Sequence, residues 1–186
     1  MCSSNEVLLV RHGETDDNAA DRFQGRIDTP LNDRGREQSR ALAAALAAAG
    51  LRAMYASPLS RARETAAIVG ERIGLDAVLD ERFMEADAGA WSGLLYAEVI
   101  ATDAPAFDAW RRDDDLFRFP GGESLVEHRV RVAAALARVR SGPLPALVVC
   151  HGGTIRAVGG LAGPRGEVGN CVLHRLSPSP AATTIP

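Results

Sequence analysis

Short apolar runs alternate with longer segments of helical periodicity along this chain. The runs predict strands at 6–10, 53–56, 77–79, 146–150 and 171–176. Between them, apolar residues recur at the spacing of amphipathic helices. Strands that alternate with helices of this length are typical of a parallel sheet covered on both sides. The pattern therefore predicts an α/β fold, a three-layer sandwich with a mostly parallel central sheet and helices on both faces.

Two of the helices have recognisable end signals. Asn32 is a favourable N-cap for an alanine-rich helix, and Gly50 is placed to end that helix. Ser57 and Pro58, read as N-cap and first helical residue, predict a second helix that Gly74 ends. These signals set the boundaries that we expect for the helices between the first three strands.

A third helix is predicted after Gly121-Gly122, behind a segment that fits the alternating pattern poorly. The apolar face of this helix is formed by Leu125, Arg129, Val132, Leu136 and Val139. The preceding segment, 94–120, contains Trp110 and three of the five phenylalanines, Phe107, Phe117 and Phe119. This concentration predicts either a lid that walls a substrate pocket or a small satellite core, and both interpretations stay open.

Length and composition limit the possible functions. The 186 residues fit one compact domain, which we expect over 1–176, with a disordered tail at 177–186. A net charge of -3 argues against broad binding to nucleic acid or anionic membranes. With no apolar run of about 18 residues and no leader pattern, neither a membrane span nor a signal peptide is indicated. Three scattered cysteines favour a cytoplasmic location and no metal site.

Two of the predicted strands end in a histidine followed by glycine. Val7–Val10 leads into Arg11-His12-Gly13, and the run ending at Cys150 leads into His151-Gly152-Gly153. Open α/β sheets bind ligands at the carboxyl ends of their strands. We therefore expect both histidines to converge on one substrate, beside the positive charge of Arg11.

These residue types are suited to phosphoryl transfer, which needs a nucleophile, a proton donor and fixed positive charge around the phosphate oxygens. A neutral imidazole can attack phosphorus, and a pKa of about 6.5 leaves His12 largely unprotonated near neutral pH. Arg11 and Arg61 can form bidentate hydrogen bonds to phosphate oxygens. His151 and the backbone N–H of Gly152 can donate further hydrogen bonds.

Three segments in this order carry a specific resemblance. Arg11-His12-Gly13-Glu14-Thr15, the stretch Ser57–Thr65 and His151-Gly152-Gly153 resemble the histidine phosphatase superfamily, which contains the cofactor-dependent phosphoglycerate mutases and many small phosphatases. The resemblance covers roughly residues 5–160 and implies a phosphoglycerate mutase-like fold. It also implies that His12 is the phosphorylated nucleophile and that Arg11, Arg61 and His151 form the phosphate pocket. Asn18, Gln24 and Gly25 match further positions that line this pocket in the family.

The same resemblance implies that Glu85 is the general acid. The family's glutamate begins the pattern Glu-x-x-x-Gly-x-Trp-x-Gly, which this chain matches from Glu85 to Gly93. Apolar neighbours such as Phe83 and Trp91 would raise the pKa of Glu85, whereas arginines would lower it, so the sequence leaves the direction open. Ser92 stands where the family often has a second glutamate, which puts the orientation of the substrate in doubt.

Three alternatives to a phosphatase with a histidine nucleophile remain at this stage. Cys150 and Arg156 also satisfy the spacing Cys-x-x-Gly-x-x-Arg of cysteine-based phosphatases, in which a thiolate attacks phosphorus. A protein that merely binds phosphorylated ligands, and a cofactor-dependent phosphoglycerate mutase, are the others. The mutases carry a longer insertion before the late His-Gly, and the stretch Pro120–Ser124 is similar to that of the small phosphatases.

The sequence therefore predicts a metal-independent phosphomonoesterase of small metabolites, with no cofactor and acting as a monomer or homodimer. Its substrate and any residual mutase activity stay open.

Overall fold

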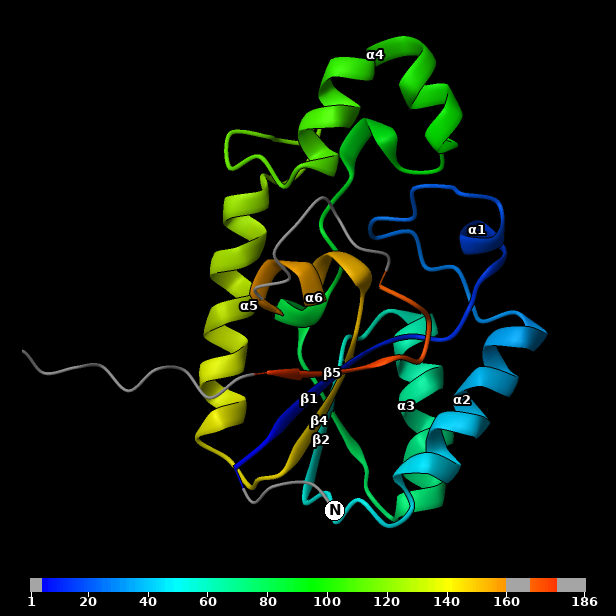
Figure 1. Cartoon of the computed structure of the whole chain (residues 1–186), viewed down its shortest axis with the longest axis vertical. Coiled ribbons are helices and arrows are strands. Elements are labelled where there is room, and N and C mark those ends of the chain that lie inside the picture. Colours follow the sequence, from blue (N-terminus) through cyan, green and yellow to red (C-terminus); the bar gives the residue numbers. More distant parts are fainter. Residues whose placement is uncertain (1–4, 160–167, 177–186) are drawn as a thin grey trace, which may run out of the picture.

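The computed structural model describes residues 5–159 and 168–176. A five-stranded sheet forms the centre of this structure (Figure 1). In chain order the strands are β1 (Val7–Arg11), β2 (Ala53–Ala56), β3 (Ala77–Leu79), β4 (Ala146–Cys150) and β5 (Leu173–Leu176). They lie in the order β3-β2-β4-β1-β5, and β5 at one edge runs antiparallel to β1 while the other pairs are parallel. The prediction of a mostly parallel sheet is confirmed.

Helices cover both faces of this sheet. Helices α2 (Asp33–Leu46) and α3 (Ser60–Ile73) lie on one side, and α5 (Leu125–Arg140) and α6 (Gly152–Gly159) lie on the other (Figure 1). Val7 and Leu9 of β1 pack into the apolar cluster on the α5 side, whereas Leu8 and Val10 pack against α2 and α3. Because both of its faces are buried, β1 is apolar throughout rather than alternating. The predicted three-layer arrangement is therefore confirmed.

The segment 94–120 forms the far end of the molecule along its longest axis (Figure 1). Its helix α4 (Tyr96–Arg111) bends at Asp103, whose φ of -153° interrupts the helix two residues before Pro105. A third apolar cluster unites its aromatic rings with Phe23 and with Trp91 of the short helix η2 (Gly89–Trp91). The interpretation as a satellite core is correct, and several of the same rings also wall a cavity.

Several predicted boundaries differ from the structure. Helix α3 begins at Ser60 with Leu59 as N-cap, so the prediction of Ser57 as N-cap is wrong. Helix α2 ends at Leu46, before Gly50, which lies in the left-handed region. The first strand is shifted by one residue relative to the prediction of 6–10. The last strand starts at Leu173 rather than at residue 171, because Cys171 has a φ of 56° that strand geometry does not allow.

The buried face of α5 also differs from the predicted one. Arg129 is only half-buried and forms an ion pair with Asp115, whereas His128 is 1% exposed and occupies the stripe between Leu125 and Val132. Both positions are compatible with helical spacing, and packing against the body of the protein selects His128.

The predicted tail at 177–186 lies outside the described residues. Within them, no helix combines the length and the apolar character that crossing a membrane requires.

Candidate active site

The sheet brings the two His-Gly segments together. Strands β1 and β4 are neighbours whose last residues, Arg11 and Cys150, pair in register. The backbone N–H of His12 donates to the carbonyl of Cys150 at 3.0 Å, and the ring centroids of His12 and His151 lie 5.2 Å apart. Both histidines therefore lie side by side at the carboxyl edge of the sheet, as the sequence predicts.

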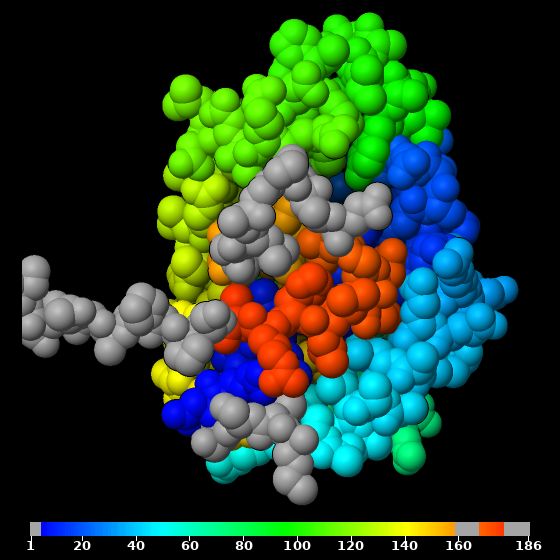
Figure 2. All heavy atoms as spheres, viewed as in Figure 1, coloured from blue at the N-terminus to red at the C-terminus, as the bar shows by residue number. Residues whose placement is uncertain are grey.

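A cavity of about 500 Å³ lies between this edge and the segment 94–120. Its inner surface includes Arg11, His12, Arg61, Glu85 and Gly152, and its outer wall includes Tyr96, Phe107, Trp110 and Phe119. Figure 2 shows the segment 94–120, in green, above the body of the molecule on one face. The aromatic segment is thus both a core of its own and a wall of this cavity.

His12 is held as a neutral imidazole with one nitrogen directed at an arginine. Its Nδ1 lies 2.7 Å from the carbonyl oxygen of Gly13, and its Nε2 accepts a hydrogen bond from Nε of Arg61 at 3.2 Å. Because a carbonyl oxygen only accepts, the proton lies on Nδ1 and the lone pair on Nε2. Burial, together with Arg61 and Arg11, holds the pKa of His12 well below 6.5.

Arg61 is 1% exposed and is oriented by two backbone carbonyls. It donates to the carbonyls of Ile27 at 2.7 Å and of Gly25 at 2.8 Å. Burial lowers the pKa of Arg61 to about 10, which leaves the guanidinium charged at neutral pH. Gly25 contributes its carbonyl, and its φ of 51° is a conformation that favours glycine.

His151 is directed by Ser57. Its Nε2 lies 2.8 Å from the Ser57 hydroxyl, so the serine that the sequence predicts as a helix cap holds an imidazole instead. His151 is 1% exposed, and its ring packs edge-on against that of His12. Three buried nitrogens here have no hydrogen-bond partner among the described residues: Nδ1 of His151, Nε of Arg11 and Nε of Arg156. Buried donors of this kind are costly unless a ligand satisfies them.

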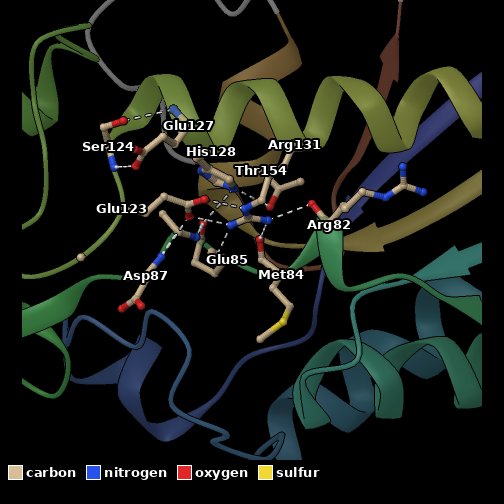
Figure 3. A network of polar contacts seen from close by, with 12 residues as sticks. Arg82, Met84, Glu85, Asp87, Glu123, Ser124, Glu127, His128, Arg131 and Thr154 are labelled. Atoms are coloured by element: carbon tan, nitrogen blue, oxygen red, sulfur yellow. Dashed lines mark hydrogen bonds and ion pairs between the residues drawn. The ribbon is translucent and has the colours of Figure 1, made fainter.

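Glu85 reaches the same cavity from the loop between η1 (Glu81–Phe83) and η2. Its Oε2 accepts from the backbone N–H of Gly153 at 2.9 Å, and its Oε1 accepts from that of Ala86 at 2.9 Å. Nε2 of His128 lies 4.0 Å from Oε1 (Figure 3). Burial alone would raise the pKa of Glu85, but His128, the two N–H donors and Arg156 together hold it below its usual value of 4.5. This settles the direction that the sequence leaves open.

An arginine of α5 fixes the loop that carries Glu85. Arg131 donates to both carboxylate oxygens of Glu123, at 2.6 and 2.8 Å, and to the carbonyls of Arg82, Met84 and Glu85 (Figure 3). Sequence reasoning missed Arg131 and His128. It named Arg156 only within the cysteine-based alternative, through the spacing Cys-x-x-Gly-x-x-Arg.

The remaining predicted pocket residues lie around the same cavity. Asn18 and Gln24 line it, and Oε1 of Gln24 accepts a hydrogen bond from the Thr15 hydroxyl at 3.1 Å. Oδ1 of Asn18 accepts from Nδ2 of Asn170 at 3.3 Å. Gly152 begins α6 directly beside Arg11.

The geometry does not support the cysteine-based mechanism. Cys150 is fully buried among the apolar residues on the α5 side of the sheet, and burial raises the pKa of its thiol. A protonated thiol directed into the core is not a nucleophile for a ligand in the cavity.

This fold and this site, with two histidines, guanidinium groups and a buried carboxylate at one sheet edge, define an enzyme class that acts on phosphate esters. A family model described as histidine phosphatase superfamily (branch 1) matches residues 7–175. The chain belongs to the histidine phosphatase superfamily.

Named relatives include phosphatases and one mutase. Phosphoserine phosphatase 1 of Hydrogenobacter thermophilus is 37% identical over 135 residues, which cover 73% of this chain and 64% of that protein. A probable phosphoglycerate mutase of Enterobacter sp. is 36% identical over 185 residues, covering 92% and 84%. The structure of a mycobacterial glucosyl-3-phosphoglycerate phosphatase in complex with VO3 superposes with a TM-score of 0.84 at 33% identity, covering 93% and 92%.

Proposed function

We propose that the protein hydrolyses a small phosphorylated metabolite, without a metal ion, through a phosphohistidine on His12. The observation that carries this proposal is the state of His12: its Nδ1 is bound to the Gly13 carbonyl, and its Nε2 faces Arg61 as a neutral base. The guanidinium groups of Arg11 and Arg61 supply the positive charge that a phosphoryl group requires.

The reaction takes place in two steps at the same site. In the first step, Nε2 of His12 attacks phosphorus, the bond to the ester oxygen breaks, and Glu85 donates its proton to the departing alkoxide. In the second step, the Glu85 carboxylate removes a proton from water, the oxygen of that water attacks the phosphohistidine, and inorganic phosphate leaves. Arg11, Arg61 and His151 hold the other phosphate oxygens in both steps.

Glu85 must be protonated when the ester bond breaks, although its pKa is lowered in the free protein. A phosphate dianion between Arg11 and Arg61 offsets their positive charge and disfavours a second anion nearby. Substrate binding therefore raises the pKa of Glu85 toward the working pH. Tyr96 and Phe107 on the outer wall would strengthen this effect by excluding water.

The test is release of inorganic phosphate from phosphomonoesters in buffer treated with EDTA. A quenched reaction should trap a phosphoenzyme that is labile in acid and stable in alkali. His12→Ala should abolish both signals, and Cys150→Ser should retain turnover. Loss of activity in Cys150→Ser with an unchanged fold would contradict the proposal.

A second assay separates hydrolysis from mutase activity. This alternative is tested because the chain is also similar to a probable phosphoglycerate mutase. Incubation with 3-phosphoglycerate should yield negligible 2-phosphoglycerate, with or without 2,3-bisphosphoglycerate. Efficient isomerisation without phosphate release would identify a mutase instead.

A further inference from the structure

Arg156 lies in the cavity beside the arginine that precedes His12. Nη2 of Arg156 lies 3.5 Å, and Nε of Arg11 3.7 Å, from the position that a Cβ on Gly152 would take. The two guanidinium groups therefore flank the same glycine at the start of α6. Nε of Arg156 is buried and has no hydrogen-bond partner among the described residues. Leaving such a donor unpaired costs about 1–3 kcal/mol, which a bound acceptor would recover.

Three other arginines of the cavity already have partners. Arg22 pairs with Asp17 at 3.6 Å, Arg129 pairs with Asp115 at 2.7 Å, and Arg61 binds two carbonyls. Within residues 5–159 and 168–176, no carboxylate lies within ion-pair distance of Arg156. Among these residues, no ion pair therefore competes with a ligand for its guanidinium group.

The position of the general acid, Glu85, indicates which part of a substrate faces Arg156. The ester oxygen must lie next to Glu85 to receive its proton, so the alcohol that leaves begins there. Nη2 of Arg156 lies 3.5 Å from the position of a Cβ on Gly152, and Glu85 accepts a hydrogen bond from the N–H of the next residue, Gly153. The guanidinium group therefore lies on the same side of the cavity as Glu85, where the leaving alcohol begins.

The balance of charge around the bound phosphate indicates a separate role for Arg156. With Glu85 protonated for catalysis, the charged side chains directly beside His12 and Gly152 are Arg11, Arg61 and Arg156, and their three positive charges face a phosphate dianion. Arg11 and Arg61, which flank His12, balance the dianion. One positive charge remains, and an anion on the leaving alcohol would neutralise it at low dielectric.

We propose that Arg156 binds a second anionic group on the leaving alcohol, so that the substrates are phosphomonoesters with a carboxylate or a second phosphate near the ester. This inference rests on the proposed hydrolysis at the same site. Guanidinium binds carboxylate and phosphate alike, so matched compounds must separate the two.

The experiment compares compounds that differ by one anionic group. O-phosphoserine and O-phosphoethanolamine differ by a carboxylate, and ethane-1,2-diol bisphosphate and 2-hydroxyethyl phosphate differ by a phosphate on the neighbouring carbon. Each compound is tested as a competitive inhibitor of p-nitrophenyl phosphate hydrolysis, and its binding is titrated calorimetrically. In one of these pairs, the wild-type protein should favour the compound with the extra anion by about tenfold or more, as expected for about 1.4 kcal/mol from a charge-assisted contact.

Arg156→Gln should reduce this preference to near one, and Arg156→Lys should restore part of it. The matched control is Arg111→Gln, which removes an exposed arginine of the same cavity and should retain the preference. A wild-type ratio near one in both pairs, or an Arg156→Gln variant that keeps the wild-type ratio, would overturn the proposal. A calorimetric preference without any phosphate release would support the proposed anion site but contradict the proposed hydrolysis.

Discussion

Replacing Gly153 by alanine should disable the proposed general acid, Glu85, without unfolding the protein. A Cβ at this position would overlap Oε1 of Glu85 and lie 3.0 Å from its Cδ. The atoms in conflict are the end of a flexible side chain, so the carboxylate moves and the helix stays. Glu85 would then lose its hydrogen bond from the Gly153 N–H and its position beside the ester oxygen.

The structure separates the expected effects on rate and on stability. Losing a positioned general acid costs about 10²–10⁴-fold in rate. For stability, the lost hydrogen bond to a charged group costs about 1.5–3 kcal/mol, and alanine in place of glycine in helix α6 recovers about 0.5–1 kcal/mol. We therefore expect a large loss of activity with a free energy of unfolding reduced by only about 0.5–2.5 kcal/mol. The assay is kcat/KM on an alkyl phosphate, with urea unfolding as the companion measurement.

Two controls test whether the effect passes through Glu85. An aryl phosphate, whose phenolate leaves without a proton, should be spared in Gly153→Ala and in Glu85→Gln. In a Glu85→Gln background, Gly153→Ala should add little. Equal slowing in both backgrounds would refute the reasoning.

Three further predictions concern residues around the histidines and Glu85. Ser57→Ala leaves Nε2 of His151 unpaired, which costs about 1–3 kcal/mol, so kcat/KM should fall by about 10–100-fold. Ser57→Thr keeps the hydroxyl and should retain more activity. Equal losses in the two variants would exclude the hydroxyl as the cause. His128→Gln removes the partner that most strongly lowers the pKa of Glu85, so the alkaline limb of the pH–rate profile should move to higher pH, and an unmoved limb would contradict this role. The pKa values of His12 and His151 are held well below 6.5, so the unfolded chain takes up protons that the folded protein does not as the pH falls below 6.5. Stability in phosphate-free buffer should therefore decrease there by up to about 1.4 kcal/mol per pH unit for each histidine, and urea midpoints that stay constant from pH 7 to 5.5 would refute it.

Local patterns in the chain were sufficient for the layers of the fold and for the inner part of the site. The apolar runs before Arg11 and His151 predicted two strands. In a parallel sheet the carboxyl ends of the strands lie at the same edge, so the two His-Gly segments were expected there together. Arg61 stands in a motif that is short and continuous in sequence, and Glu85 was named from the resemblance to the histidine phosphatase superfamily, whose glutamate motif is also continuous. Each of these predictions depends on residues within a few positions of one another.

The surroundings of Glu85 were decided only by tertiary structure. Ser57 reads as a helix cap until His151 is brought within 2.8 Å of it from 94 positions away. His128 and Arg129 satisfy the helical period equally well, and only packing of α5 against the body of the protein buries His128 beside Glu85. The direction of the Glu85 pKa is likewise the balance of burial against His128, Gly153 and Arg156. Charges and donors from separate elements act through distance in space, which sequence spacing does not record.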